Sequence, residues 1–148
     1  MRLYVGIVGL FVGILFVAGL VWMVLLFGAM GSTSKLPLGV VVATVSRDSR
    51  DQFLEDLRKF ASENGFICTA EVIPPDNEDV AIEMHRSDMR IIGGNTPDDK
   101  AKINLAFYKN GFFFISEPLP QAKVDAVMVA LRESLRQVKG VTSEIRQH

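Results

Sequence analysis

A long apolar run near the start of the chain places the strongest constraint on how it can fold. Residues 3–27 read LYVGIVGLFVGILFVAGLVWMVLLF and contain no Asp, Glu, Lys or Arg. Because a helix rises 1.5 Å per residue, about 20 apolar residues are enough to cross the hydrocarbon core of a bilayer. In lipid the backbone polar groups must be satisfied within the segment, and a helix does so. The run predicts a transmembrane anchor over residues 1–29, with residues 3–27 in the lipid bilayer.

Two alternatives to a retained anchor arise from the same residues. A cleaved signal peptide has an apolar region of about 7–15 residues followed by a small-residue cleavage site. The run here is longer, although residues 28–31, GAMG, would weakly permit cleavage. A helix buried in a soluble protein would have to be covered on all sides, which a domain of this size cannot do. We therefore expect a single-pass membrane protein.

The few polar features of the run predict its orientation and one mode of association. Arg2 precedes the run, and the first basic residue after it is Lys35. The positive-inside rule therefore favours a cytoplasmic N-terminus and a C-terminal domain on the periplasmic or another extracytoplasmic side. Gly9 and Gly13 form a small-xxx-small pair that would let two such helices approach closely. A homodimer is thus one of the expected partners.

Composition divides the rest of the chain into a tether and a domain. Residues 30–37, MGSTSKLP, are mostly small and polar and end with proline, which is typical of a short flexible tether. Residues 38–148 have the length of one extramembrane domain. The formal net charge of the 148 residues is −1 at pH 7. Nucleic-acid-binding domains usually carry a basic excess, so no nucleic-acid partner is expected.

Helical spacing of apolar residues predicts two amphipathic helices in this domain. Ser49 and Gln52 have the spacing of a capping box, which predicts the start of the first helix, and Gly65 predicts its end. Pro120 suits the first turn of the second helix, and Gly140 suits its C-terminal cap. The apolar stripes comprise Phe53, Leu57, Phe60 and Ala61 in the first helix, and Val124, Val127, Met128, Leu131, Leu135 and Val138 in the second.

Runs of β-branched residues and period-two alternation predict about six short strands. These runs are 38–46, 66–73, 80–85, 89–94, 103–108 and 112–115. Pro74 and Pro75 stop the second run. The composition of residues 93–99 predicts a loop, and Asn110–Gly111 predicts a tight hairpin turn before the last run.

The expected fold class is α+β. The economical arrangement is a two-layer sandwich, in which both helices cover one face of a mostly antiparallel sheet. A ferredoxin-like order of strand, helix, strands, helix and strand results if residues 141–145 add a final strand.

Residue types that carry chemistry are scarce. His85 and His148 are the two histidines and Cys68 is the one cysteine, so the sequence predicts neither a metal site nor a catalytic site. Cys68 and His85 could form a nucleophile–base pair if their strands adjoin and the thiol is exposed. Cys68 shares the strand parity of Phe66 and Ala70, which favours burial of the thiol. Gly93–Gly94 lacks the helix N-terminus of a phosphate cradle, so no cofactor is expected.

A set of six residues is the candidate protein-binding surface. Arg86 and Asp88 flank a turn and could pair bidentately, as a surface ion pair or as part of a recognition patch with Arg90 and Tyr108. Alternation places Phe113 and Ile115 together on one face of the last strand. If the helices cover the other face, a partner, the membrane surface, the tether or the first strand should cover this one. The six residues are Arg86, Asp88, Arg90, Tyr108, Phe113 and Ile115.

These observations favour a single-pass, membrane-anchored binding or accessory module whose extramembrane domain contacts another protein. One alternative is an immunity-type inhibitor of a toxin at the membrane. The other is a small membrane-tethered hydrolase that uses Cys68 or His85.

Overall fold

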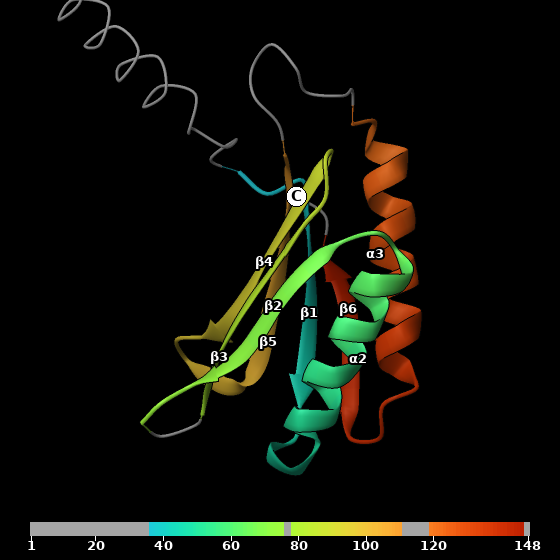
Figure 1. Cartoon of the computed structure of the whole chain (residues 1–148). Helices are drawn as coiled ribbons and strands as arrows, with labels where there is room; N and C mark the ends of the chain where they lie inside the picture. Colours follow the sequence, from blue (N-terminus) through green and yellow to red (C-terminus); the bar gives the residue numbers. More distant parts are fainter. Residues whose placement is uncertain (1–35, 76–77, 111–118, 147–148) are drawn as a thin grey trace, which may run out of the picture. The chain divides into compact units, whose positions relative to one another are not determined.

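The computed structural model describes residues 36–75, 78–110 and 119–146 (Figure 1). The chain divides into two units, Met1–Thr33 and Ser34–His148, and every described residue belongs to the second. The predicted transmembrane helix and most of the predicted tether lie outside the described residues. No helix among the described residues is long and apolar enough to cross a membrane.

An antiparallel sheet and two helices make up the described part of the domain. The elements in chain order are β1 Gly39–Val45, η1 Arg47–Ser49, α2 Arg50–Glu63, β2 Ile67–Ile73, β3 Asp79–His85, β4 Met89–Thr96, β5 Asp99–Lys109, α3 Gln121–Arg136 and β6 Val141–Arg146. The described strands form one six-stranded sheet in the order β2-β3-β4-β5-β1-β6, in which every neighbouring pair is antiparallel. The strand Val141–Arg146 is the one that the ferredoxin-like order required, and four of the described strands lie between the two helices in the chain.

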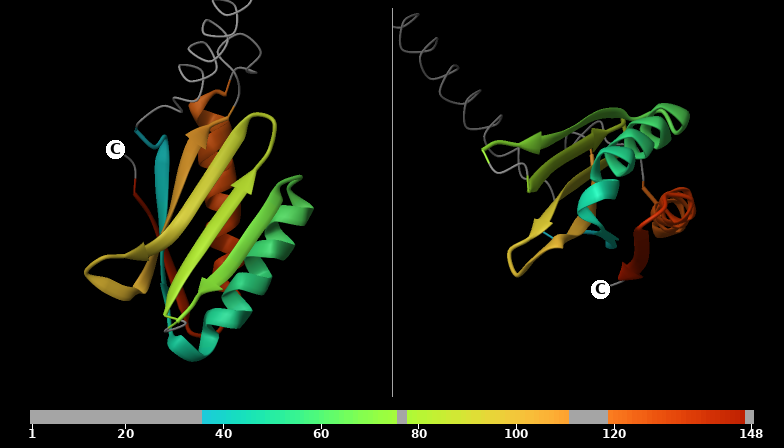
Figure 2. Two further views of the ribbon diagram at one scale, coloured as in Figure 1. Left: turned by 60° about the vertical axis from the view of Figure 1, so that its left-hand side comes forward. Right: turned by 90° about the horizontal axis from the view of Figure 1, so that it is seen from below.

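Both helices pack on the same face of the sheet, so the predicted two-layer α+β sandwich is confirmed (Figure 2). Helix α2 packs mainly against β2, and α3 packs against β6 and β1. Strand alternation sends every second side chain toward the helices. The strand side chains buried in this core include Val41, Ala43, Val45, Ala70, Val80, Ile82, Met84, Met89, Ile91, Ile103, Leu105 and Phe107. The helices contribute Phe53, Leu54, Leu57, Phe60, Ala61, Val124, Met128, Leu131 and Leu135.

The helix ends differ in detail from the predicted caps. Ser49 is the N-cap of α2, as predicted, but its side chain makes no capping hydrogen bond there. Its Oγ instead accepts a hydrogen bond from Ser46 Oγ at 2.8 Å, while Gln52 Nε2 donates to Asp56 Oδ1. The capping box is therefore wrong, because these side chains have closer partners elsewhere. Gly65 lies just after the end of α2 with a φ of 73°, as expected for the glycine that was predicted to end this helix.

The second helix ends earlier than its sequence pattern indicated. Pro120 is the N-cap of α3, and the helix stops at Arg136. Gly140 has a φ of 80°, but it lies in the turn before β6 and does not cap the helix. Val138 lies beyond the end of the helix but is also buried. Its apolar side chain therefore made the predicted helix longer than the observed one.

The predicted loop at residues 93–99 is wrong over its first half, because β4 continues to Thr96. Gly93 lies between Ile82 on β3 and Leu105 on β5. A Cβ at this position would stand 2.5 Å from Leu105 Cδ2 and 3.1 Å from Ile82 Cβ. Gly93 is therefore a position where side chains of the neighbouring strands pack directly over the backbone of β4. The composition of residues 93–99 resembles that of a loop, which is why the end of the strand was missed.

Replacing Gly93 with alanine should lower the free energy of unfolding by about 1–3 kcal/mol, because Leu105 and Ile82 must give way to the added methyl group. The adjacent Gly94→Ala substitution is the matched control. Its Cβ would meet the Val80 carbonyl oxygen at 3.5 Å, which is ordinary contact. Urea denaturation of both variants checks this prediction, and equal stabilities would contradict the packing described for Gly93.

Candidate interaction surface

The face of the sheet opposite the helices is uncovered by any described helix, and we call it the open face. Ile67 and Ile73 on β2 are 67% and 45% exposed, and Ile92 on β4 is 40% exposed. They are three of the five large hydrophobic side chains that are exposed within residues 36–75, 78–110 and 119–146. Strand alternation assigns all three to the open face. Ile92 follows Ile91, which is fully buried on the other face, and Ile67 and Ile73 are an odd number of residues from Ala70, which is buried there too.

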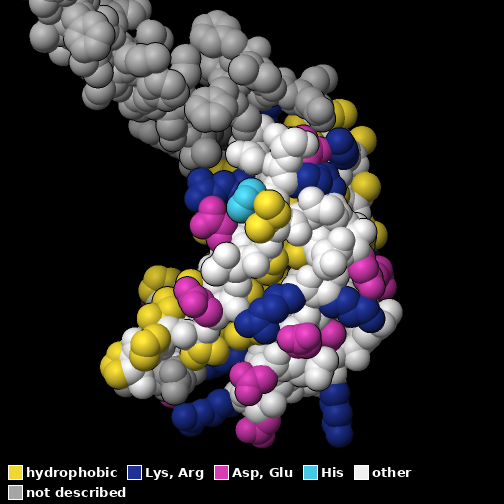
Figure 3. All heavy atoms as spheres, viewed as in Figure 1, with side chains coloured by type: hydrophobic (Ala, Val, Ile, Leu, Met, Phe, Trp, Pro, Cys, Tyr) yellow, Lys and Arg dark blue, Asp and Glu magenta, His cyan; other side chains and the backbone are white. Residues whose placement is uncertain are grey.

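Small apolar and charged side chains surround Ile92 on the open face. The strand register places Glu83 on one side of it and Ala106 on the other, and Ala106 in turn lies beside Val40. Ala106 and Val40 are half-buried. Figure 3, which views the molecule from the β2 edge of the sheet, shows apolar side chains interspersed with acidic and basic ones, without a field of one sign. The surface therefore has an apolar centre and a mixed polar surround.

Arg90 and Tyr108, two of the predicted binding residues, are cross-strand neighbours on this face. His85 lies on the other side of Arg90, and Ile67 lies beside His85. The Arg90 guanidinium pairs with Glu83 Oε1 at 2.9 Å. The structure thus brings these residues into one row across β2, β3, β4 and β5. Arg and Tyr are residue types favoured in protein interfaces.

Arg86 and Asp88, two other predicted binding residues, lie at the turn between β3 and β4. Arg86 Nε donates to Asp88 Oδ1 at 2.6 Å and its Nη2 donates to Oδ2 at 3.2 Å, which confirms the predicted bidentate pair. Asp88 is only 1% exposed, so this is a buried pair and no surface ion pair. Lys123 of α3 also reaches Asp88 Oδ2, at 2.6 Å.

Further contacts make this ion cluster a junction between elements. Arg86 Nη1 donates to the Asn64 carbonyl at the end of α2, at 3.0 Å. The Arg86 guanidinium carbon lies 4.5 Å from the centre of the Phe66 ring, a cation–π contact. Asn110, at the end of β5, donates its backbone N–H to the Asp88 carbonyl and its side chain to the Arg86 carbonyl. The cluster joins α2, α3, β5 and the β3–β4 turn.

Electrostatics at Asp88 favour the ionised carboxylate. Burial alone would raise the pKa of Asp88, but hydrogen bonds and charge attraction from Arg86 and Lys123 outweigh it and lower the pKa to about 2. An acid whose two oxygens are both engaged by cations is stabilised in its charged form. This arrangement indicates a structural role for Arg86 and Asp88, while their part in binding a partner stays a prediction. Phe113 and Ile115, the remaining two candidates, lie outside the described residues.

Sequence reasoning missed Ile67, Ile73 and Ile92 as surface residues. Alternation along β2 indicated the exposure of Ile67 and Ile73. Phe66 and Ala70 are buried on one face, so the odd-numbered residues of the strand must lie on the other face. Ile73 sits directly before Pro74, where the strand ends. These residues could have been found from alternation alone.

The register separates Cys68 from His85. Ile67 is opposite His85, and Cys68 is opposite Met84, which is fully buried on the helix side. Cys68 therefore faces the helices and His85 faces away from them, so the two cannot form a nucleophile–base pair. Burial raises the pKa of the half-buried Cys68 thiol, and the nearby Arg58 charge offsets this only in part. Such a thiol has little thiolate at neutral pH.

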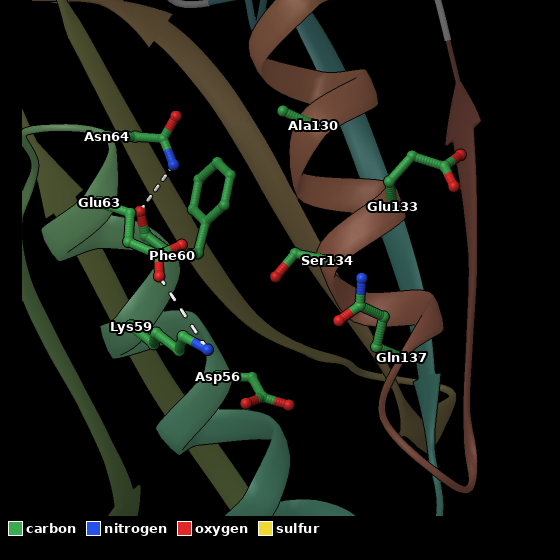
Figure 4. A pocket seen from close by; sticks show the side chains of 9 residues that line it. All are labelled: Asp56, Lys59, Phe60, Glu63, Asn64, Ala130, Glu133, Ser134 and Gln137. Carbon is green, nitrogen blue, oxygen red and sulfur yellow. Dashed lines mark hydrogen bonds and ion pairs between the residues drawn. The ribbon is translucent and has the colours of Figure 1, made fainter.

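A polar groove of about 350 Å³ separates α2 from α3 (Figure 4). Phe60 of α2 and Asn64 directly after it line one side, and Ser134 of α3 and Gln137 directly after it line the other. The Asn64 side chain donates to the Phe60 carbonyl at 2.8 Å. The charged side chains that line the groove have partners within their own helices: Lys59 pairs with Glu63, Glu133 pairs with Arg136, and Asp56 accepts a hydrogen bond from Gln52. The groove holds no histidine or cysteine beside Ser134 that could activate it.

No group of three or more His, Cys, Asp and Glu side chains within the described ranges is arranged to hold a metal ion.

Comparisons with known proteins leave the family open. No protein-family model and no curated protein sequence matches the chain. Among solved structures, the chain is similar to one titled "X-ray crystal structure of a heavy metal efflux pump, crystal form I", with 13% sequence identity and a TM-score of 0.35. That alignment covers 92% of this chain and 13% of the other chain.

Proposed function

We propose that the protein is a single-pass, membrane-anchored binding or accessory module, whose extramembrane domain contacts another protein through the open face of its sheet. The apolar run of residues 3–27 supports the anchor, since its length matches the hydrocarbon core. The charge pattern around the run supports a domain on the extracytoplasmic side.

The observation that carries the binding role is the exposure of Ile92 near the middle of a sheet face. Ile92 lies on β4, which has strands on both sides, and 40% of its surface is exposed. Isolated exposed apolar residues are common, but here Ile92 adjoins Ala106 and lies one row from Arg90 and Tyr108. An apolar centre with Arg and Tyr at its border matches the composition of protein interfaces.

Site-specific photo-crosslinking in native membranes tests this proposal. A photoreactive residue at position 92 should yield one discrete protein adduct, because the open face is covered by its partner. The matched control is position 129 on α3, where Val129 is exposed to a similar extent, 44%. The proposal is wrong if the two positions yield the same products or if position 92 reacts with lipid and water alone.

A further inference from the structure

Strand β2 is an outer edge of the sheet among the described strands, and none of them pairs with the backbone groups on its outer side. The Ala70 carbonyl accepts a hydrogen bond from Arg58 Nη2 at 2.5 Å, so it points away from β3. In an antiparallel strand the N–H and C=O of one residue point to the same side, and alternate residues share that side. Cys68, Ala70 and Val72 therefore direct their backbone groups outward. Figure 2 shows β2 as the outermost strand on this side of the sheet.

The sequence of β2, ICTAEVI, is complementary to itself in the antiparallel direction. A two-fold axis through Ala70 would pair all seven residues of the strand with those of a second copy. The outward-pointing residues then meet one another in three pairs, each of which exchanges two hydrogen bonds. These three pairs are Cys68 with Val72, Ala70 with Ala70, and Val72 with Cys68. Between and beyond them, Thr69 lies opposite Glu71 and Ile67 lies opposite Ile73.

Side chains select this register over its neighbours. It places the exposed Ile67 of each copy opposite the exposed Ile73 of the other, on the open face. A shift of the axis to Thr69 would shorten the overlap and put Ile67 opposite Glu71. Apolar cross-strand pairs stabilise a sheet, whereas an apolar residue opposite a carboxylate does not. We infer that β2 pairs with β2 of a second copy about Ala70, which joins the two sheets into one.

Arg58 must leave the Ala70 carbonyl before two β2 strands can pair, and this cost weakens the association. Its guanidinium occupies the central carbonyl of the edge and also pairs with Glu55 at 3.3 Å. The Arg58 and Glu55 side chains are 47% and 71% exposed, so displacing Arg58 from Ala70 costs little. Arg58 therefore competes with the second copy for the Ala70 carbonyl and keeps the association reversible. Natural proteins commonly protect sheet edges with charged side chains.

The opposite edge, β6, lacks the features of β2. Its open-face residues include Glu144 and Arg146, which pair with each other. Charged side chains of this kind protect an edge from further pairing. The inferred pairing uses the edge of the sheet and does not depend on the proposed function, whose centre is Ile92.

Disulfide trapping of the full chain in detergent tests the register. In Val72→Cys, the new thiol lies opposite Cys68 of the second copy, and opposed Cα atoms about 5.5 Å apart permit a disulfide. Within one chain these residues are about 13 Å apart along the strand, which forbids it. Oxidation should link most of the Val72→Cys protein into dimers. The wild type should stay unlinked. Ile73→Cys should also stay unlinked, because its two thiols face opposite sides of the sheet. Adding Arg58→Ala should speed the linking.

A charge-pair experiment makes the inference falsifiable even if trapping perturbs the strand. One variant carries Ile67→Lys and Ile73→Lys, and the other carries Ile67→Glu and Ile73→Glu. Each variant should bind copies of itself less than the wild type binds copies of itself, because like charges then lie opposite each other. The Lys variant should bind the Glu variant more than either binds copies of itself. Capture that is equal in all combinations would overturn the pairing, as would linking of Ile73→Cys to the same extent as Val72→Cys.

Discussion

Replacing Asp88 with asparagine is expected to lower the free energy of unfolding by about 2–3 kcal/mol at neutral pH. The carboxylate pairs with both Arg86 and Lys123, and it is itself nearly inaccessible. Removing its charge leaves two cations facing each other beside an amide. The loss falls at or below the lower end of the range for buried pairs, because the Arg86 and Lys123 side chains are 22% and 47% exposed and solvent screens them.

The matched control for this substitution is Asp79→Asn. Asp79 pairs with Lys100, but both side chains are about half exposed. Exposed pairs of this kind contribute about 0–1 kcal/mol. Urea denaturation of the full chain in detergent measures both variants, and a small effect at Asp88 would contradict the account of the ion cluster.

The stabilisation from Asp88 should also depend on pH. The folded pKa, about 2, lies below the ordinary value of 3.8. The stabilisation is therefore fully present above about pH 4 and is lost as the pH falls from about 4 to about 2. The difference in stability between the wild type and Asp88→Asn should shrink over that interval and stay constant between pH 5 and pH 7.

Replacing Phe107 with alanine should cost about 3–5 kcal/mol, whereas the same change at Tyr108 should cost about 1 kcal/mol. The two residues are adjacent on β5 but face opposite sides of the sheet. Phe107 is fully buried beneath the helices, so its removal leaves a cavity. Tyr108 is half-buried on the open face, where solvent can occupy the space that it leaves.

Thermal or urea unfolding of Phe107→Ala and Tyr108→Ala measures this difference directly. The comparison tests whether the helices cover one face of the sheet and leave the other open. Equal losses of stability at the two positions would mean that both faces are buried.

Local patterns were sufficient to predict most of the elements and the layer arrangement. Alternation at Val80, Ile82 and Met84 predicted both a strand and its buried face, and the structure confirms both. Alternation depends only on near neighbours along the chain. The same kind of reasoning failed at Gly93, because the space that the glycine leaves is filled by Leu105, twelve residues away.

The ion cluster shows why the candidate site could be predicted only in part. Arg86 and Asp88 are two residues apart, so their pairing could be inferred from the sequence. Lys123 and the Asn64 carbonyl come from different helices. Burial of Asp88 depends on how those helices pack on the sheet, and no short stretch of sequence contains that information. For the same reason the strand order, in which β1 lies between β5 and β6, could not be derived from a list of strands.

The most direct test of the binding role compares the reactivity of single thiols at two equally exposed positions. Ile92→Cys and Val129→Cys, each combined with Cys68→Ser, place one thiol on the open face and one on the outer side of α3. In purified protein both should react with a thiol reagent at similar rates, because Ile92 and Val129 are 40% and 44% exposed. In native membranes the thiol at position 92 should be protected by the bound partner, while the thiol at position 129 should react as before. Unchanged reactivity at position 92 in native membranes would contradict the proposal that the open face binds another protein.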